Sequence, residues 1–180
     1  NIRTVNFCNP ISSISPVMVR IPWVTCCLLL NLTIATHAVE WTSLFDGVHL
    51  DGWIKRGGNA TYQVQDGVIV GTTQQGGANT FLCTQRDYDD FILELEYLVD
   101  PAMNSGIQIR SLSKPDYHNG VVHGYQVEID PSPRAWSGGI YDESRRGWLY
   151  PLKDHPKAQA AFQQNQWNHY RIEAVGDSIR

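Results

Sequence analysis

The amino-acid sequence predicts an all-β domain, folded as an antiparallel sandwich or barrel. Short runs in which apolar and polar residues alternate recur along the chain, and this period is typical of strands with one face in a core. Turn-forming pairs such as Asp51-Gly52, Asp66-Gly67 and Gly138-Gly139 separate these runs. Many short strands, regular turns and one short helix favour this fold class.

The first part of the chain has the layout of a secretory leader. The first residue is Asn, and the first Met, Met18, precedes a single charge at Arg20, a mostly apolar run and the small residues of Thr36-His37-Ala38. We therefore expect residues 1–17 to be mis-assigned upstream sequence, residues 18–38 to be a signal peptide, and residues 39–180 to form one secreted or periplasmic domain. An uncleaved membrane anchor is the alternative, but the apolar run is shorter than the ~20 residues that a span needs.

Charge and cysteine content limit the function classes. The chain carries a net charge of −4, and the predicted mature part is more acidic because Arg3 and Arg20 leave with the leader. No basic patch is visible, which argues against nucleic acid and, after signal cleavage, against a membrane surface. Cys83 is the one cysteine after the leader, so no internal disulfide is expected, and its apolar neighbours indicate a buried residue rather than a nucleophile.

Individual elements follow from local patterns. The pair Asp66-Gly67 between two β-forming runs predicts a hairpin over residues 62–70. Residues 91–98 and 167–174 alternate as two further strands, with Glu94, Glu96 and Glu173 on polar faces that we interpret as solvated and laced with weak ion pairs. A helix is predicted over residues 155–164, with Asp154 as its N-cap.

The stretch from Asn104 to Asp130 holds the first candidate for a site. In its two predicted strands Ile107, Ile109, Tyr125, Val127 and Ile129 face the core. Gln108, Arg110, Gln126, Glu128 and Asp130 then share the opposite face. This group of a guanidinium, amides and carboxylates differs from an ordinary solvent face, and it suits a polar ligand. The alternative is a solvated face with surface ion pairs.

The order of motifs resembles a known family. The motifs are Trp41-Thr-Ser-Leu-Phe-Asp-Gly47, Leu50-Asp-Gly-Trp53, Asp66-Gly-Val-Ile-Val-Gly71, Asn104-Ser-Gly-Ile107, Gly124-Tyr-Gln-Val-Glu128, Gly139-Ile-Tyr141 and Trp167-Asn168. In this order, over Trp41 to Arg180, they are similar to the 3-keto-disaccharide hydrolase family, a secreted domain formerly of unknown function. The resemblance implies a concanavalin A-like jelly roll that acts on sugars whose C3 hydroxyl has been oxidised to a ketone.

Two departures from the family pattern affect the expected site. Many members have Glu and then Gln in the strand where this chain has Gln126 and then Glu128, so the carboxylate is moved by two residues along one face. A family domain also continues beyond the position of Arg180. We therefore expect the C-terminal strands, and with them at least one site residue, to be missing from this sequence.

A 3-keto group makes the proton on C2 acidic, so a glycosidic bond can break by elimination, after which water adds back. This route needs a base, an oxyanion stabiliser and an acid. We assign Glu128 as the base, Arg110 or His123 as the stabiliser, and Asp130 or His123 as the acid. The candidate substrate-binding residues are Gln108, Gln126, Asn104, Tyr141, Trp136 and Arg146. Direct hydrolysis by Glu128 and Asp130, ~6.6 Å apart on one strand, is the other route.

Several of these residues also have a purely structural interpretation. His123 could simply bond the loop before its strand, Trp136 could be loop packing, and Arg146 could belong to a charged loop. No cofactor is expected, and a divalent metal on Glu128, Asp130 and His123 stays open because no spacing here is diagnostic of one. The runner-up function is a non-catalytic carbohydrate-binding module on the same sheet. The sequence does not predict an oligomeric state.

Overall fold

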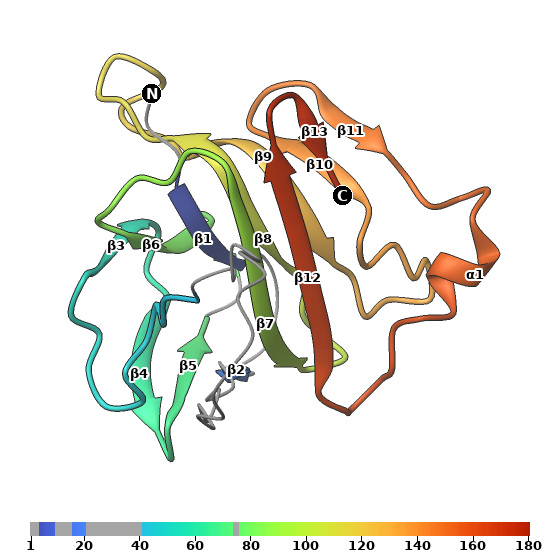
Figure 1. Ribbon diagram of the computed structural model, residues 1–180, viewed down its shortest axis with the longest axis horizontal. Helices are drawn as coiled ribbons and strands as arrows, with labels where there is room; N and C mark the ends of the chain where they lie inside the picture. The colour runs from blue at the N-terminus through green and yellow to red at the C-terminus, as the bar shows by residue number, and fades with distance from the viewer. Residues whose placement is uncertain (1–3, 10–15, 21–40, 74–75) are drawn as a thin grey trace, which may run out of the picture.

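The structure is a computed structural model that describes residues 4–9, 16–20, 41–73 and 76–180. Its strands form two antiparallel sheets that pack face to face (Figure 1). The prediction of an antiparallel β-sandwich is confirmed.

The larger sheet, here called sheet A, has seven strands in the order β11-β10-β9-β8-β1-β6-β3. These strands are β1 (Thr4–Asn9), β3 (Trp53–Gly57), β6 (Thr80–Thr84), β8 (Ser105–Leu112), β9 (His123–Ile129), β10 (Ile140–Glu143) and β11 (Gly147–Tyr150). Sheet B has six strands in the order β13-β12-β7-β2-β5-β4. They are β2 (Pro16–Arg20), β4 (Thr61–Gln65), β5 (Val68–Thr72), β7 (Phe91–Val99), β12 (Asn168–Val175) and β13 (Ser178–Ile179).

The hydrophobic core lies between the sheets. Sheet A contributes Ile107, Ile109, Val127 and Ile129, and sheet B contributes Leu93, Leu95, Tyr97 and Ile172. Because side chains alternate across a strand, Gln108, Gln126 and Glu128 lie on the face of sheet A that is turned away from sheet B. We call this face the outer face of sheet A.

Several local predictions are confirmed. Strands β4 and β5 form the expected hairpin, and Asp66 and Gly67 at its turn have φ angles of 50° and 76°, as a two-residue turn of this kind requires. Cys83 is buried, and burial raises the pKa of its thiol to about 12. It is therefore a protonated core residue rather than a nucleophile.

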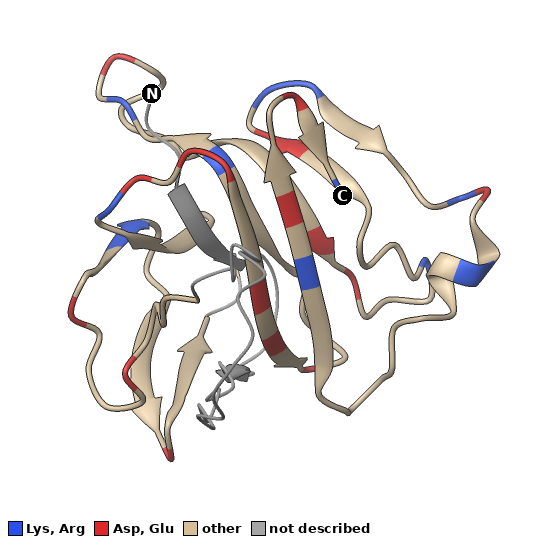
Figure 2. Ribbon diagram, viewed as in Figure 1, with Lys and Arg blue, Asp and Glu red and all other residues tan. Residues whose placement is uncertain are grey.

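The charged residues of β7 and β12 lie on paired strands of sheet B (Figure 2). They alternate with the core residues Leu93, Leu95 and Ile172, so they face away from the core. Arg171 bonds to Glu94, and it also donates to Glu173 at 3.0 Å. These side chains are partly exposed, so the interpretation as a solvated face with surface ion pairs is confirmed.

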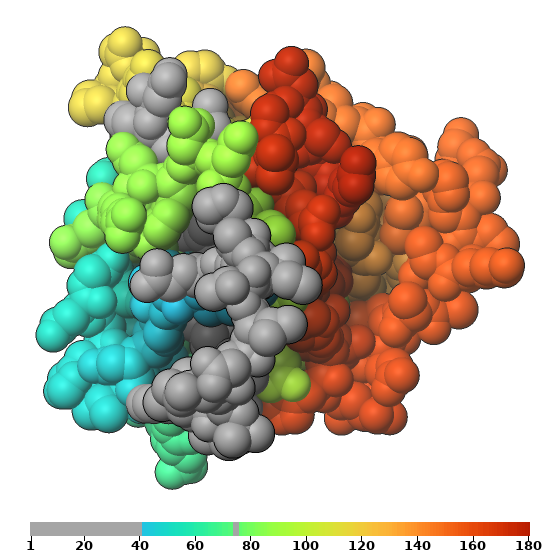
Figure 3. Space-filling model, viewed as in Figure 1, coloured from blue at the N-terminus to red at the C-terminus, as the bar shows by residue number. Residues whose placement is uncertain are grey.

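The predicted helix is wrong in length and in its cap. Helix α1 covers only Pro156–Gln159, its cap residue is His155 rather than Asp154, and no side chain caps it. None of its residues is buried, so no apolar face stabilises further turns. The segment that carries α1 projects from one side of the molecule (Figure 3). No helix among the described residues is long and apolar enough to cross a membrane.

The predicted leader overlaps two strands. In this structure β1 pairs with β8 and β6, and β2 pairs with β7 and β5, so residues ahead of Val39 lie in the middle of both sheets. Residues 4–9 and 16–20 thus take part in the sheets of this structure, and the domain bounds 39–180 stay a prediction. Residues 21–38, with the expected cleavage position, lie outside the described residues, and cleavage after Ala38 stays a prediction.

Candidate active site

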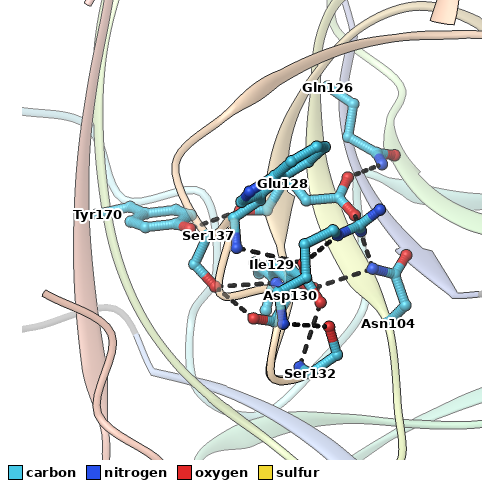
Figure 4. A network of polar contacts seen from close by, with 10 residues as sticks. Asn104, Gln126, Glu128, Ile129, Asp130, Ser132, Ser137 and Tyr170 are labelled. Atoms are coloured by element: carbon cyan, nitrogen blue, oxygen red, sulfur yellow. Dashed lines mark hydrogen bonds and ion pairs between the residues drawn. The ribbon is translucent and has the colours of Figure 1, made fainter. Parts of the chain in front are cut away.

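Glu128 lies at the centre of a polar cluster on the outer face of sheet A (Figure 4). Its side chain is 4% exposed. Asn104, just before β8, donates from Nδ2 to Oε1 of Glu128 at 2.6 Å, and Gln126 donates from Nε2 to Oε2 at 2.7 Å. Both carboxylate oxygens are therefore held by neutral amides from two adjacent strand segments.

The amide of Gln126 is itself fixed by a chain of buried groups. Gln108 donates from Nε2 to the side-chain oxygen of Gln126 at 2.9 Å, and Ser111 donates its hydroxyl to the side-chain oxygen of Gln108 at 2.6 Å. Gly106 makes room for this arrangement, because a Cβ atom there would lie 2.5 Å from Cγ of Gln126. The chain of donors thus runs from Ser111 toward the carboxylate of Glu128.

Burial raises the pKa of Glu128 above the ordinary value of a glutamate, and it outweighs the hydrogen bonds from Asn104 and Gln126, which lower it. The nearby charge of Asp130 raises the pKa further, and that of Arg134 lowers it. A carboxylate with a raised pKa that is held in a fixed orientation is suited to general-base chemistry near neutral pH.

Arg134, which sequence reasoning missed, lies beside this carboxylate. Its Nε donates to Oδ2 of Asp130 at 2.7 Å, and a terminal nitrogen lies 3.7 Å from Oε1 of Glu128. The signal in the sequence is the turn Asp130-Pro-Ser-Pro-Arg134, whose prolines favour a sharp return of the chain.

Two tryptophans hold the guanidinium of Arg134. Its carbon lies 4.7 Å from the ring centroid of Trp136 and 4.9 Å from that of Trp148, within the range of cation–π contacts. Tyr141 adds a third ring, 5.2 Å from Trp148. Trp136 and Tyr141, both predicted substrate-binding residues, therefore belong to one aromatic group around Arg134.

Asp130 differs from Glu128 in its environment. Burial would raise its pKa, but hydrogen bonds from Ser132, from the Arg134 guanidinium and from the Trp136 backbone outweigh burial and lower the pKa. Asp130 therefore stays ionised near neutral pH and organises the loop after β9. This does not favour the predicted role as an acid.

The structure does not bring Arg110 to Glu128. A bulge follows Ile109 in β8, and Arg110 takes a φ of 48°, so the simple alternation that placed it on the outer face fails. Its guanidinium bonds to the carbonyl oxygen of Gly176 and, at 3.2 Å, to Asp90, both in the part of the chain that belongs to sheet B. Arg110 joins the two sheets in this structure.

His123 and Arg146 also lie away from the cluster. His123 is five residues before Glu128, about 17 Å along the strand, and its Nδ1 lies 2.8 Å from the carbonyl oxygen of Val121 while its ring stacks on Tyr117. His123 therefore fits the alternative interpretation from the sequence, in which it bonds to the loop before its strand and takes no part in catalysis. Arg146 bonds to buried Asp142, whose strand neighbour is Tyr125 rather than Gln126.

The outer face carries a second carboxylate that the sequence did not single out. Glu143 ends β10, and Asn79 donates to it at 3.2 Å. Burial raises its pKa above the ordinary value of a glutamate. Glu143 pairs with Gly124, four residues before Glu128, so the two carboxylates are not neighbours on the sheet. Among the described residues no three His, Cys, Asp or Glu side chains are grouped closely enough to hold a metal ion.

Comparison with known proteins identifies the family. Residues 40–180 match the model of the 3-keto-alpha-glucoside-1,2-lyase-like domain. No curated protein matches the chain. The matched span covers every residue of the Glu128 cluster, and the motifs that predicted the resemblance lie within it. The chain therefore belongs to the family of 3-keto-alpha-glucoside-1,2-lyase-like domains, which is the 3-keto-disaccharide hydrolase family.

Proposed function

We propose that this protein is a secreted or periplasmic enzyme that cleaves the glycosidic bond of 3-keto sugars by elimination followed by hydration. One observation carries the proposal: Glu128 is a buried carboxylate with a raised pKa, oriented by two amides. The description of the family supports it, because the name 3-keto-alpha-glucoside-1,2-lyase denotes an elimination across C1 and C2 of a 3-keto-α-glucoside.

Glu128 would take the C2 proton, and the electrons of the C2–H bond would move toward the C3 oxygen as an enolate. The enolate then reforms the C3 ketone, a C1=C2 double bond forms, and the C1–O bond breaks to release the aglycone. Water adds across the double bond, with hydroxyl at C1 and a proton at C2. In the chair form of an α-glucoside the C2 proton and the C1 oxygen lie on opposite ring faces, so the leaving oxygen takes its proton from a group other than Glu128 or from solvent.

Arg134 would stabilise the enolate. In a bound 3-keto sugar the C3 ketone is next to C2, the carbon that would lose its proton to Glu128. A guanidinium 3.7 Å from Glu128 would therefore lie close to the ketone oxygen. Its side chain is 41% exposed whereas that of Glu128 is 4% exposed, so the guanidinium is the more accessible of the two groups. Trp136 and Trp148, on which the guanidinium packs, would lie beside the bound sugar.

The second candidate function is a carbohydrate-binding module without catalysis. The half-buried aromatic group of Trp136, Trp148 and Tyr141 favours it, because aromatic rings bind sugars without any need for a base. Glu128 separates the two candidates, since only the enzyme requires this carboxylate to act as a base.

Turnover in deuterated water tests the elimination. The protein should release a 3-keto sugar that carries deuterium at C2. The control is the released sugar incubated with the protein in deuterated water, and the deuterium content at C2 should be higher after turnover than in this control. Bond cleavage without that deuterium would indicate direct displacement. If the wild-type protein binds 3-keto sugars but cleaves none, the binding-module function replaces this proposal.

A further inference from the structure

A cavity of ≈ 200 Å³ lies beside β7 and β12, and none of the residues that line it belongs to the Glu128 cluster of Asn104, Gln126 and Glu128. Tyr97, Ser137 and Tyr170 form its inner part, and Phe162, Gln163 and Trp167 lie nearer to solvent. We call this cavity the rim pocket. It is smaller than the roughly 300–1,000 Å³ typical of sites for drug-sized ligands, so it has room for about one ring.

The inner part of the rim pocket offers hydroxyl oxygens. Tyr170 donates its hydroxyl to the main-chain oxygen of Glu128, and Ser137 donates to the main-chain oxygen of Asp130 at 3.2 Å while accepting from its N–H at 2.8 Å. Tyr97 bonds within the same group. These hydroxyls therefore bond to the main chain and to one another, and they make the inner part of the pocket polar.

The outer part of the rim pocket is aromatic. Trp167 is 40% exposed and Phe162 is partly buried, so both rings have surface that a ligand would cover. The side-chain amide of Gln163 lies beside them and supplies both a donor and an acceptor. A ligand that fits must therefore present C–H surface to the rings and hydroxyl groups to the inner oxygens.

The rim pocket has no carboxylate for a cationic ligand. Among the described residues that line it, none is Asp, Glu, Lys or Arg, and His169 is the one residue with an imidazole. Burial raises the pKa of Tyr97 to about 12 and that of Tyr170 well above its ordinary value, so both hydroxyls stay protonated. A cationic ligand would find no negative charge in this lining to offset its loss of water.

We propose that the rim pocket binds one neutral sugar ring, at a site separate from the Glu128 carboxylate. Rings for the C–H face, the amide of Gln163 and a polar inner wall of hydroxyl groups match a polyhydroxylated ring better than an apolar or a cationic ligand. This inference goes beyond the proposed function and does not rest on it, because it requires no oxidised sugar and no catalysis.

Binding of methyl α-D-glucopyranoside to the full chain, measured by NMR titration, tests this inference. That sugar carries no ketone, so it is not a substrate of the proposed reaction. Trp167→Ala should weaken binding by about tenfold or more, and Trp167→Phe should restore most of it. Trp41→Ala is the matched control, because Trp41 is similarly exposed, at 44%, and does not line the rim pocket.

The same titration on Trp136→Ala separates the rim pocket from the candidate active site, because Trp136 does not line the rim pocket. The rim pocket predicts unchanged binding of methyl α-D-glucopyranoside by this variant. Loss of binding in Trp136→Ala together with normal binding in Trp167→Ala would place the sugar on the outer face of sheet A and overturn the inference. The absence of saturable binding by the wild type would also overturn the inference. So would displacement of the sugar by tetramethylammonium at concentrations lower than that of the sugar, which would indicate an aromatic cage for a cation.

Discussion

Asn104 donates its side-chain amide to Oε1 of Glu128 at 2.6 Å, across 24 residues of sequence. The contact joins the start of β8 to the end of β9, and it fixes one oxygen of the carboxylate while Gln126 fixes the other. The proposed chemistry depends on this orientation, because a base must be held within reach of the proton that it removes.

Asn104→Leu removes the donor and should shift the pH dependence of kcat/KM. The hydrogen bond from Asn104 lowers the pKa of Glu128, so its loss raises that pKa further. A base works in its ionised form, and the acidic limb of the profile should therefore move to higher pH. Gln65→Ala, on an exposed face of β4, is the control. An unchanged limb would show that Asn104 does not act on the base.

Arg134→Gln should move the same limb in the same direction and also lower kcat. The positive charge of Arg134 lowers the pKa of Glu128, and the guanidinium is the proposed enolate stabiliser. Arg134→Lys should recover part of both effects, since it keeps the charge and loses the planar fork. Arg86→Gln, where the arginine packs on Tyr88 instead, is the matched control. Full activity in Arg134→Gln would remove Arg134 from the mechanism.

Arg110→Met should destabilise the fold and leave the chemistry intact. The side chain is 12% exposed and bonds to Asp90 and Gly176, which links β8 to sheet B. Loss of these bonds should cost about 1–3 kcal/mol in the free energy of unfolding, measured by urea denaturation. The kcat of the folded fraction should equal that of the wild type. A variant with native stability and little activity would restore the role that the sequence predicted for Arg110.

The sequence predicted the faces of the strands but not the loops. Period-two alternation correctly placed Gln108, Gln126 and Glu128 on one face, because regular strand geometry fixes side-chain direction. The alternation failed at Arg110, where a bulge with a positive φ interrupts the strand. The sequence has no glycine or other turn-forming residue at this position that would have predicted the bulge. Arg134 was missed because its position depends on how a loop folds around Asp130, which is a tertiary contact.

Export is a separate prediction. If residues 18–38 are a signal peptide, the exported protein begins at Val39, and β1 and β2 are removed from the centres of both sheets. Backbone amides of β6 and β5 that pair with them should then exchange faster with deuterium than in the full chain, unless another strand replaces them. N-terminal sequencing of the exported protein is the measurement, and an intact leader would contradict the prediction.

Turnover of a 3-keto-α-glucoside by Glu128→Gln tests the central claim most directly. The substitution keeps the size of the side chain and removes its basicity, so the rate should fall by a factor of order 10²–10⁴, as for a lost general base. Melting should stay close to that of the wild type, and binding of the sugar should change little. Turnover at the wild-type rate by a folded Glu128→Gln protein would show that Glu128 is not the base.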